Sequence, residues 1–332
     1  MKKLLSIVLI TVIVFSFAAC TDSGNTPETP AEKTDINFFV LTGPTGIGAV
    51  HMMQQAQNNE GLENYHITAV AAPDEIVSKI SNGDADIAAI STNLAAKLYN
   101  ITGGEIEILA VNTLGVLYAI TNENTEIAEI SDLAGKTVYT TGKGANPEYI
   151  INFLLKENGL TPASDLQIEY VADGSKLTSV WAQTPDAVII APQPVATAIT
   201  LNYENAEIAL DLTEEWDKVS ESSALMMGCI VARKDFIEEN PQAVENFLTD
   251  YKASVSATET DPESTASLCE TYGIVAKAAV AQKALPYCNI CFITGEEMKT
   301  KLTGYLEILL AADPQSVGGA IPADDFWYPA AN

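Results

Sequence analysis

Basic residues are scarce in this sequence, and arginine is almost absent. The 332 residues contain 17 Lys and Arg against 44 Asp and Glu, which gives a formal net charge of −27 at pH 7. Nucleic-acid-binding proteins need basic patches, so this acidic balance argues against that class and predicts no nucleic-acid partner. The one arginine, Arg233, could bind a carboxylate, sulfonate or phosphate, but "VARKDF" favours a solvated position at a strand-to-helix exit. An anionic ligand would therefore depend on helix N-termini and on Lys143.

Catalytic motifs are also missing. His51 and His66 are the two histidines, and no Ser-His-Asp spacing, HExxH motif or carboxylate pair stands out. The run "TTGKGAN" does not fit a phosphate-binding P-loop, because Lys143 lies between Gly142 and Gly144 and no Ser or Thr follows it. No G-x-G-x-x-G motif with an acidic residue ~20 positions later is present either. The sequence thus predicts a protein that is not an enzyme and has no cofactor.

Cysteines are few, and metal ligands near them are fewer. Apart from Cys20, the chain has Cys229, Cys269 and the pair Cys288 and Cys291 in "CNIC". A zinc site would need a second pair or nearby histidines, so we expect no metal. A thioredoxin-like CxxC should open a helix, whereas the flanks "LPYCNICFITG" are typical of a strand or loop. Buried thiols and a disulfide are the main alternatives, with metal or redox chemistry as the remainder.

No apolar run reaches the ~20 residues of a membrane span. The N-terminus reads "MKK", then the apolar stretch "LLSIVLITVIVFSF", then "AAC" ending at Cys20. This is the pattern of a secretory signal peptide, and a cysteine directly after small residues resembles the bacterial lipoprotein cleavage motif. The resemblance implies removal of residues 1–19 and a lipid on Cys20; a plain signal peptide is the alternative. Residues 20–34 predict a flexible tether, so we expect an extracytoplasmic protein, lipid-anchored to the bacterial cell membrane.

Strand-like and helix-like runs alternate along the chain after the expected tether. "DINFFVLTG", "YHITAV" and "ADIAAI" are typical of strands. Each is followed by a helical pattern: "IGAVHMMQQAQNNEG", which Gly61 should close, "PDEIVSKISNG" and "TNLAAKLYNITGG". This βαβαβα order predicts an α/β fold with a mainly parallel sheet covered by helices.

The same order returns further along the chain. "KTVYTTGKG" matches "INFFVLTGPTG", so that Gly142 corresponds to Gly43. "TPDAVIIAPQPVA" matches "DADIAAISTNLAA", so that Gln193 corresponds to Asn93. Chance similarity between α/β segments is the alternative, but an ordered match of three strand-to-helix junctions favours two related lobes.

Two mostly apolar β-type runs, over residues 113–123 and 222–235, lie between helical segments. They predict that the chain leaves the first lobe, builds the second and returns. The helical C-terminal part would complete the first lobe. The expected domains are therefore lobe 1 over residues 35–117 and 226–332, and lobe 2 over residues 118–225.

Ligands of open α/β sheets bind beyond the carboxyl ends of the strands, where loops pass into helices. If two lobes face each other, the loops after four strands would line one cleft, and free N–H groups at helix starts would point into it. The candidate ligand-binding residues in these loops are Thr42, Gly43, Pro44, Thr45, Thr92, Asn93, Gly142, Lys143, Gly144, Asn146 and Gln193.

Four stretches together resemble the solute-binding proteins of ABC transporters: "GPTGIG", "NGDADIAAI", "ISDLAGKTVYTTGKG" and "IAPQPVAT". The similar subfamily takes in nitrate-, sulfonate- and taurine-binding proteins and binders of the thiamine pyrimidine precursor. The resemblance implies a two-lobed type II periplasmic-binding fold with two hinge strands, closure around a small molecule, and docking as a monomer on a membrane permease with its ATPase. That family typically has Glu-Pro where this chain has Gln193-Pro194.

Uncharged side chains dominate the expected cleft. Carboxamides and hydroxyls suit a heterocycle, so we hypothesise a neutral or weakly charged organic solute such as a pyrimidine-like ring. A sulfonate- or taurine-type anion is the alternative. Trp181, Tyr118 and Tyr149 could stack on a ring, although core packing is the simpler expectation for each. The uncharged polar groups are those of Thr45, Thr92, Asn93, Asn146 and Gln193.

Two other classes of protein are weaker alternatives. A related fungal fold makes the thiamine pyrimidine from pyridoxal phosphate and a histidine, but that family has a CCCFC stretch where this chain has "CNIC". His51 is the nearest histidine to the first glycine turn, and a helix-face histidine is more often structural. A surface adhesion or scaffold lipoprotein would expose large apolar patches and would give the glycine and amide turns no role.

Overall fold

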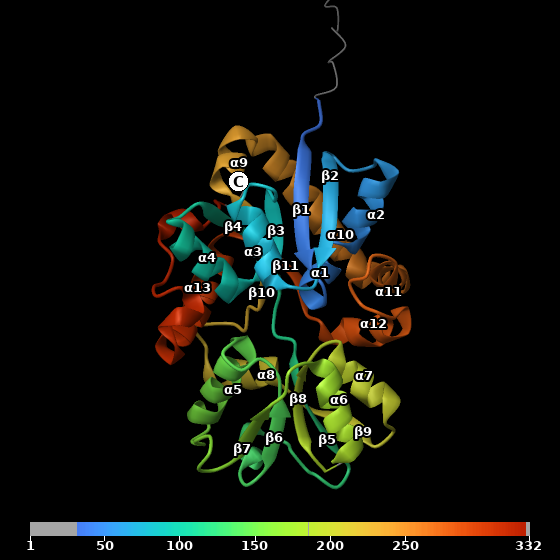
Figure 1. The fold of residues 1–332 in the computed structure, drawn as a ribbon, viewed down its shortest axis with the longest axis vertical. Helices are drawn as coiled ribbons and strands as arrows, with labels where there is room; N and C mark the ends of the chain where they lie inside the picture. The colour runs from blue at the N-terminus through green and yellow to red at the C-terminus, as the bar shows by residue number, and fades with distance from the viewer. Residues whose placement is uncertain (1–31, 185, 330–332) are drawn as a thin grey trace, which may run out of the picture. The chain divides into compact units, whose positions relative to one another are not determined.

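Two mixed β-sheets organise the chain (Figure 1). The computed structural model describes residues 32–184 and 186–329; the expected signal peptide, Cys20 and most of the tether lie outside the described residues. In the first sheet, β1, β2 and β3 are parallel, β10 runs antiparallel between β3 and β4, and β11 pairs antiparallel with β4. The order across this sheet is β2 (Asn64–Val70), β1 (Asp35–Leu41), β3 (Ile87–Ser91), β10 (Gly228–Arg233), β4 (Ile106–Thr113) and β11 (Ile290–Ile293).

The second sheet repeats this order. β6 pairs in parallel with β7 and β8, and β5 runs antiparallel between β8 and β9. In each sheet the inserted antiparallel strand is the first one that the chain makes after crossing from the other sheet. The predicted α/β class with two helix-flanked sheets is confirmed, but the sheets are mixed and not mainly parallel as predicted, because the sequence did not indicate this insertion. The strands are β7 (Gln167–Tyr170), β6 (Thr137–Thr140), β8 (Val188–Pro192), β5 (Leu117–Asn122) and β9 (Ala206–Asp211).

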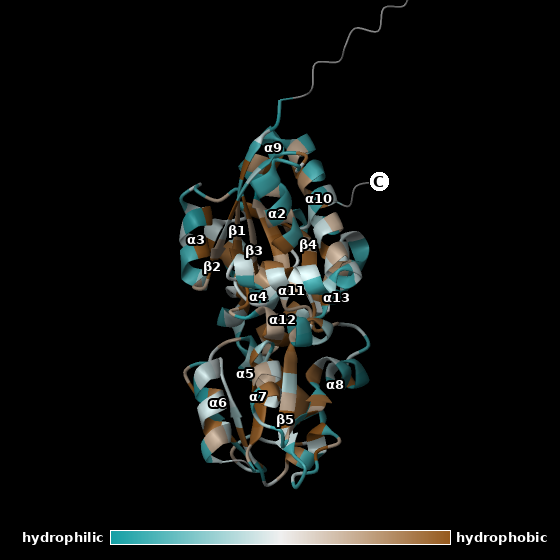
Figure 2. Cartoon of the chain, turned by 90° about the vertical axis from the view of Figure 1, so that its right-hand side faces the viewer, coloured by the Kyte–Doolittle hydropathy of each residue, from teal (hydrophilic) through white to brown (hydrophobic). Residues whose placement is uncertain are grey.

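Helices cover both faces of the first sheet. Neighbouring residues of β3 alternate between two cores: Ala88 and Ile90 pack with α3, α4 and α13, whereas Ile87 and Ala89 pack with α2, α10, α11 and α12. Figure 2 shows the resulting pattern, with hydrophobic residues on strands such as β1 and β3 and hydrophilic residues on helices such as α3 and α9. The helices are α1 (Pro44–Ile47), α2 (Val50–Asn58), α3 (Pro73–Ser81), α4 (Thr92–Thr102), α9 (Lys234–Glu239), α10 (Pro241–Thr260), α11 (Pro262–Thr271), α12 (Ala278–Ala284) and α13 (Gly295–Ala312).

The second sheet is covered in the same way. Residues of α6 and α7 form a small core with one face, and α5 and α8 pack on the other. The helices are α5 (Asn146–Glu157), α6 (Gly174–Gln183), α7 (Val195–Asn202) and α8 (Leu212–Val219). Short 3-10 helices are η1 (Ile130–Leu133), η2 (Leu285–Tyr287), η3 (Pro314–Val317) and η4 (Asp324–Phe326).

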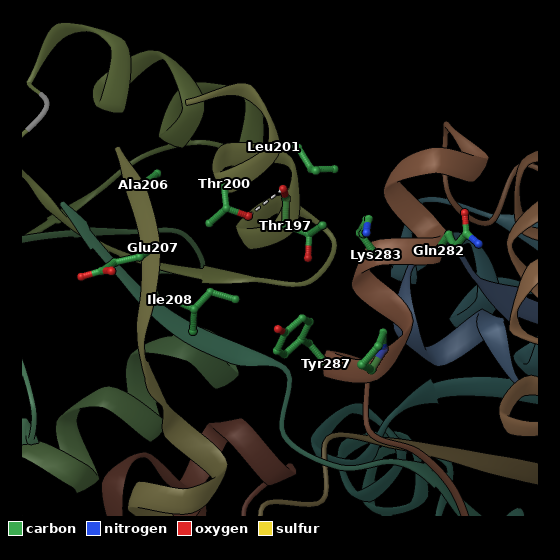
Figure 3. A pocket seen from close by; sticks show the side chains of 10 residues that line it. Thr197, Thr200, Leu201, Ala206, Glu207, Ile208, Gln282, Lys283 and Tyr287 are labelled. Atoms are coloured by element: carbon green, nitrogen blue, oxygen red, sulfur yellow. Dashed lines mark hydrogen bonds between the residues drawn. The ribbon is translucent and has the colours of Figure 1, made fainter. Parts of the chain in front are cut away.

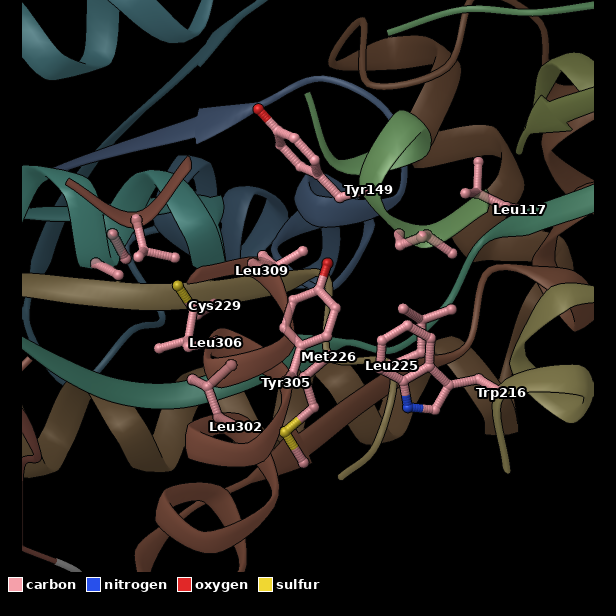
Figure 4. Close-up of a cluster of buried hydrophobic side chains, with 14 of the residues drawn as sticks. Leu117, Tyr149, Trp216, Leu225, Met226, Cys229, Leu302, Tyr305, Leu306 and Leu309 are labelled. Carbon is pink, nitrogen blue, oxygen red and sulfur yellow. The ribbon is translucent and has the colours of Figure 1, made fainter. Parts of the chain in front are cut away.

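One apolar cluster continues from the first sheet to the second (Figure 4). At its centre is Trp216 of α8, which is fully buried. Its ring centroid lies 4.5 Å from that of Phe153 of α5 and 5.5 Å from that of Tyr305 of α13. Its indole N–H donates to the Ser223 hydroxyl at 2.9 Å. The two sheets thus share buried surface along the contact of α13 with α5 and α8.

Local sequence explains most helix boundaries, with one exception. Pro73 opens α3, acidic residues occupy its first turn and Lys79 its last, as the helix dipole favours. The prediction that Gly61 closes the helix after the first strand is wrong. α2 ends earlier, at Asn59, which adopts the left-handed conformation and donates its N–H to the carbonyls of Ala56 and Gln55. Asparagine tolerates that conformation, so it replaces glycine as the stop signal.

The four described cysteines are free thiols, as one of the alternatives expected. Cys229, Cys269 and Cys288 are fully buried, and burial raises the pKa of Cys269 and of the half-buried Cys291 to about 12. Over residues 32–184 and 186–329, no group of three or more His, Cys, Asp or Glu side chains could hold a metal ion. Within the same ranges, no helix has both the length and the apolar character needed to cross a bilayer.

Candidate functional site

The two crossovers anchor the ends of equivalent strands. Thr92, directly after β3, donates its backbone N–H to the carbonyl of Met227 at 3.1 Å, and Met227 directly precedes β10. Gln193, directly after β8, donates its N–H in the same way to Val116 at 2.9 Å, and Val116 directly precedes β5. The Met227 N–H bonds the Thr113 carbonyl at 2.9 Å, so the crossovers lie side by side. Both strand ends are therefore fixed at one junction.

This equivalence corrects the sequence alignment by one residue. Gln193 occupies the place of Thr92 and not, as predicted, that of Asn93. The equivalence rests on the two main-chain hydrogen bonds. The sheets also differ in register: Phe38 of β1 pairs with Ile87, 49 positions later, whereas Val138 of β6 pairs with Val188, 50 positions later. The second repeat thus has one additional residue between its first and third strands.

The loop after β1 is held by buried polar groups. Gly43 has a φ of 86°, and its N–H donates to the Ile274 carbonyl at 2.9 Å. The Thr45 carbonyl accepts a hydrogen bond of 2.9 Å from the carboxamide of Asn112, which is buried. Pro44 and Thr45 lie in the short helix α1, not in an open loop as the sequence suggested. The backbone of this loop is therefore fixed before any ligand binds.

The loop after β3 has already used part of its hydrogen-bonding capacity. The Thr92 hydroxyl, fully buried, donates to the carbonyl of Met226 at 2.7 Å. The Asn93 carboxamide donates to the Ser316 carbonyl in η3 at 3.4 Å. Thr92 thus holds the second crossover, and its proton is not available to a ligand.

A carboxylate, that of Glu148, lies at the glycine turn after β6. Gly142 and Gly144 adopt φ values of 79° and 72°, and the Gly144 N–H donates to the carboxylate of Glu148 at 2.5 Å. The Lys143 ammonium lies 5.8 Å from the ring centroid of Tyr170 in the neighbouring strand. A carboxylate at this turn repels a second anion, so the turn is a poorer anion site than its glycines suggest.

Two buried carboxamides beside these loops have unused atoms. Asn146, the first residue of α5, is 6% exposed, and its Oδ1 has no hydrogen-bond partner among the described residues. Gln193 is 2% exposed; its Oε1 accepts from the Thr197 hydroxyl at 2.8 Å, whereas its Nε2 has no partner in the described chain. A buried polar group without a partner costs about 1–3 kcal/mol. Such atoms in native proteins indicate a missing partner, such as a ligand or water.

The three predicted stacking rings are buried. Trp181 is 1% exposed and packs in the core of α6 and α7, and Tyr118 donates its hydroxyl to the Tyr287 carbonyl at 2.8 Å. Tyr149 of α5 donates to the Asp313 carboxylate at 3.0 Å, which ties α5 to the end of α13. Burial and this carboxylate raise the pKa of Tyr149 to about 12, so it remains a hydrogen-bond donor at neutral pH. All three rings pack against other side chains of the protein, and none has a face open to a ligand.

Arg233 and His51 have structural partners. The Arg233 guanidinium pairs with Asp86 at 3.1 Å and with Asp235 at 2.6 Å, and its side chain is 21% exposed rather than solvated. Asp86 directly precedes β3 and Thr92 directly follows it, so this ion pair lies at the other end of the strand from Thr92. The His51 ring Nε2 is 2.7 Å from the Thr265 hydroxyl, and burial lowers the pKa of this histidine. Neither side chain is available to the strand-end loops.

A pocket of about 550 Å³ opens between elements of the two sheets (Figure 3). We call it the seam pocket. Its lining includes Thr197 and Leu201 of α7, Ile208 of β9, and Gln282, Lys283 and Tyr287 of α12 and η2. The predicted loop residues do not line it, but Thr197 bonds the side chain of Gln193 directly behind it. Sequence reasoning missed Tyr287 because its exposure depends on contact between distant segments.

Comparison with known proteins places this geometry in a family. The family whose model matches residues 59–282 is described as ABC transporter, phosphonate, periplasmic substrate-binding protein. No curated protein matches the chain.

Solved structures share the fold. An ABC transporter structure from Parabacteroides distasonis has 22% identity and a TM-score of 0.75, covering 89% of this chain and 99% of that one. The periplasmic aliphatic sulphonate binding protein of Escherichia coli has 15% identity and a TM-score of 0.67, covering 89% and 92%. The alkanesulfonate-binding protein of Xanthomonas axonopodis pv. citri, bound to MOPS, has 12% identity and a TM-score of 0.64, covering 90% and 100%. At these identities the likeness shows the fold alone.

Proposed function

Because this chain belongs to the phosphonate-type family of periplasmic substrate-binding proteins of ABC transporters, we propose that it closes two lobes around a small organic solute and delivers it to a membrane permease. The observation that carries this proposal is the extent of the family match, since residues 59–282 include strands of both sheets. The five strands of the second sheet follow the same order as five of the six strands of the first, which supports lobes over residues 35–117 with 226–332 and over 118–225. The permease with its ATPase is the inferred partner, and the binding protein acts as a monomer whose lobes move about the crossovers.

The solute is neutral or weakly charged and binds where the strand-end loops meet. Support comes from the carboxamides of Asn146 and Gln193, whose unpartnered atoms offer one acceptor and one donor. Further support comes from charge: Arg233 is engaged in two ion pairs elsewhere, and Glu148 already occupies the Gly144 amide. A pyrimidine-like ring has the matching set of acceptors and donors.

An anionic solute is the second candidate, and one observation favours it. The N-cap of α5, Ala145, makes no side-chain hydrogen bond to the first turn, so the backbone N–H of Asn146 stays available. Pro147 has no N–H, and the Glu148 N–H donates to the Ala145 carbonyl at 3.0 Å. Each such helix-terminus contact is worth ~0.3–1 kcal/mol when exposed and more when desolvated. The phosphonate description of the family and the sulphonate-binding relatives agree with this candidate.

Isothermal titration of the purified protein separates the candidates. The panel consists of cytosine, ethanesulfonate, methylphosphonate and nitrate. We expect cytosine or a related pyrimidine to bind, because it supplies partners for both carboxamides, and we expect the three anions to bind weakly. Tight sulfonate or phosphonate binding without pyrimidine binding would reverse the choice of solute. Absence of binding across this panel and a wider set of solutes would contradict the transport function itself.

Replacing Asn146 with Leu should separate binding from stability. The unpartnered amide is lost, so the free energy of unfolding should stay the same or rise by about 1 kcal/mol. Affinity for the solute should fall by at least about tenfold, because a buried hydrogen bond to the ligand is lost. Urea unfolding and isothermal titration measure the two effects. Asn158→Leu, at the far end of the same helix, is the control and should leave binding unchanged; equal affinity in both variants would remove Asn146 from the site.

We also propose that the protein is held at the membrane by a lipid on Cys20, with residues 20–34 as the tether. The support is the sequence pattern alone, since these positions precede or border the described residues. An extracytoplasmic location agrees with the family.

A further inference from the structure

The seam pocket gathers exposed apolar groups that are separate elsewhere. In the described part of the chain, the exposed large hydrophobic residues are Leu62, Ile101, Leu201 and Tyr287. Leu201 is 50% exposed and Tyr287 41% exposed, and both line this one pocket although α7 and η2 belong to different sheets. Single exposed apolar residues need no explanation. Two of them on opposite sides of a pocket indicate a surface that a ligand covers.

The ring of Tyr287 is held in position. The buried Tyr118 ring meets it edge-on, with centroids 5.6 Å apart and planes at 81°. The Tyr118 hydroxyl also donates to the Tyr287 carbonyl at 2.8 Å. An aromatic ring that is already fixed loses little conformational entropy when a ligand stacks on it. Tyr287 is thus the open ring that Trp181, Tyr118 and Tyr149 do not provide.

Polar groups in the pocket favour a ligand with acceptor atoms. Figure 3 shows the Tyr287 ring pointing toward Ile208 of β9, while the Glu207 carboxylate is turned away from it. Lys283 and Gln282 have no hydrogen bond or ion pair among the described residues, so both can donate to a ligand. Leu201 lies in the last turn of α7, whose carbonyl dipoles disfavour a full negative charge.

The pocket also borders the unpartnered carboxamide of Gln193. Thr197, which is 3% exposed, lines the pocket and donates its hydroxyl to Gln193 Oε1 at 2.8 Å. A volume of about 550 Å³ suits a small organic molecule. The pocket and the strand-end loops are therefore linked by one hydrogen bond through α7.

We propose that the seam pocket is a second binding site, separate from the strand-end loops, for an uncharged aromatic or heteroaromatic compound that stacks on Tyr287 and accepts a hydrogen bond from Lys283 or Gln282. This inference goes beyond the proposed function, because the residues that line the pocket are not the strand-end residues proposed to bind the transported solute. Because the walls come from elements of both sheets, a ring bound here favours the arrangement in which α7 and η2 stay close.

Benzamide and cyclohexanecarboxamide test the proposal, because they share a carboxamide and only benzamide is flat and aromatic. In ligand-observed NMR titrations of the full-length protein, we expect saturable benzamide binding in the millimolar range or tighter, and weaker binding of cyclohexanecarboxamide. Tyr287→Leu should weaken benzamide binding about threefold to tenfold, which is the usual range for a lost aromatic pair. Tyr287→Phe keeps the ring and should retain the affinity, and Leu62→Ala, outside the pocket, should change nothing.

Three outcomes would overturn the proposal: equal affinity for the two amides, unchanged benzamide binding in Tyr287→Leu, or no saturable benzamide binding in the millimolar range. None of these outcomes bears on transport, because the solute panel is titrated separately and can give binding that does not depend on Tyr287. Failure of the panel with benzamide still bound would instead contradict the proposed function.

Discussion

Replacing Trp216 with Ala should lower the free energy of unfolding by about 3–5 kcal/mol, the usual cost of removing a large buried aromatic side chain. Trp216 is fully buried, packs against the rings of Phe153 and Tyr305 at tilted angles, and donates a hydrogen bond to Ser223. Its loss leaves a cavity where α5, α8 and α13 meet, so part of the damage falls on the contact between the sheets. Urea unfolding followed by far-ultraviolet circular dichroism measures the change.

Trp181→Ala is the matched control for this result. Trp181 is equally buried but packs only with elements of the second sheet. Both variants should lose stability by a similar amount. Only Trp216→Ala should separate the unfolding of the two sheets into distinct transitions, because a shared core is what makes unfolding cooperative. A loss below about 1 kcal/mol for Trp216→Ala would mean that the cavity collapses without cost.

Replacing Cys20 with Ser should abolish lipid anchoring. The thioether to the lipid requires the cysteine sulfur, and a serine of similar size cannot replace it. Each buried methylene of an acyl chain contributes about 0.8 kcal/mol to membrane binding. A chain without its lipid loses all of these contributions together, so it should leave the membrane fraction. In a bacterial host fed an alkyne fatty acid, the natural sequence should be labelled and should enter the detergent phase on Triton X-114 partitioning.

The control for Cys20→Ser is Cys291→Ser, which changes a half-buried thiol of the folded body and should leave the label intact. Label on the Cys20→Ser variant would place the lipid elsewhere. An unlabelled natural sequence would favour the plain signal peptide, and the protein would then be released in soluble form.

The fold class could be predicted because its signals are local. Periodic apolar positions, Pro73 and the glycine stops define strands and helices within short windows, and the repeat of this order indicated two related halves. The insertion of β5 and β10 as antiparallel strands could not be predicted, because pairing partners depend on where distant segments meet. The equivalence of Gln193 with Thr92 could not be predicted for the same reason, because it depends on the hydrogen bonds that join the strand ends to the crossovers.

The loops of the site could be predicted, but the state of their hydrogen-bonding groups could not. The rule for open sheets indicates which loops lie at the strand ends, but not which groups have already been used. Thr92 has given its proton to Met226, and the Gly144 amide is bonded to Glu148, and neither fact is visible in sequence. The roles of Asn146 and Gln193 in binding stay predictions. Tyr287 had no sequence signal beyond a proline before it, because its exposure arises from the meeting of η2 with α7 and β9.

The paired main-chain hydrogen bonds at the crossovers have a consequence for divergence. Thr92 to Met227 and Gln193 to Val116 join backbone to backbone, so substitution of these side chains leaves both bonds in place. These two contacts can therefore persist while the surrounding side chains change. Contacts of this kind do not constrain the adjoining side chains, so the loops can change their chemistry while the fold stays the one that solved structures share at only 12–22% identity.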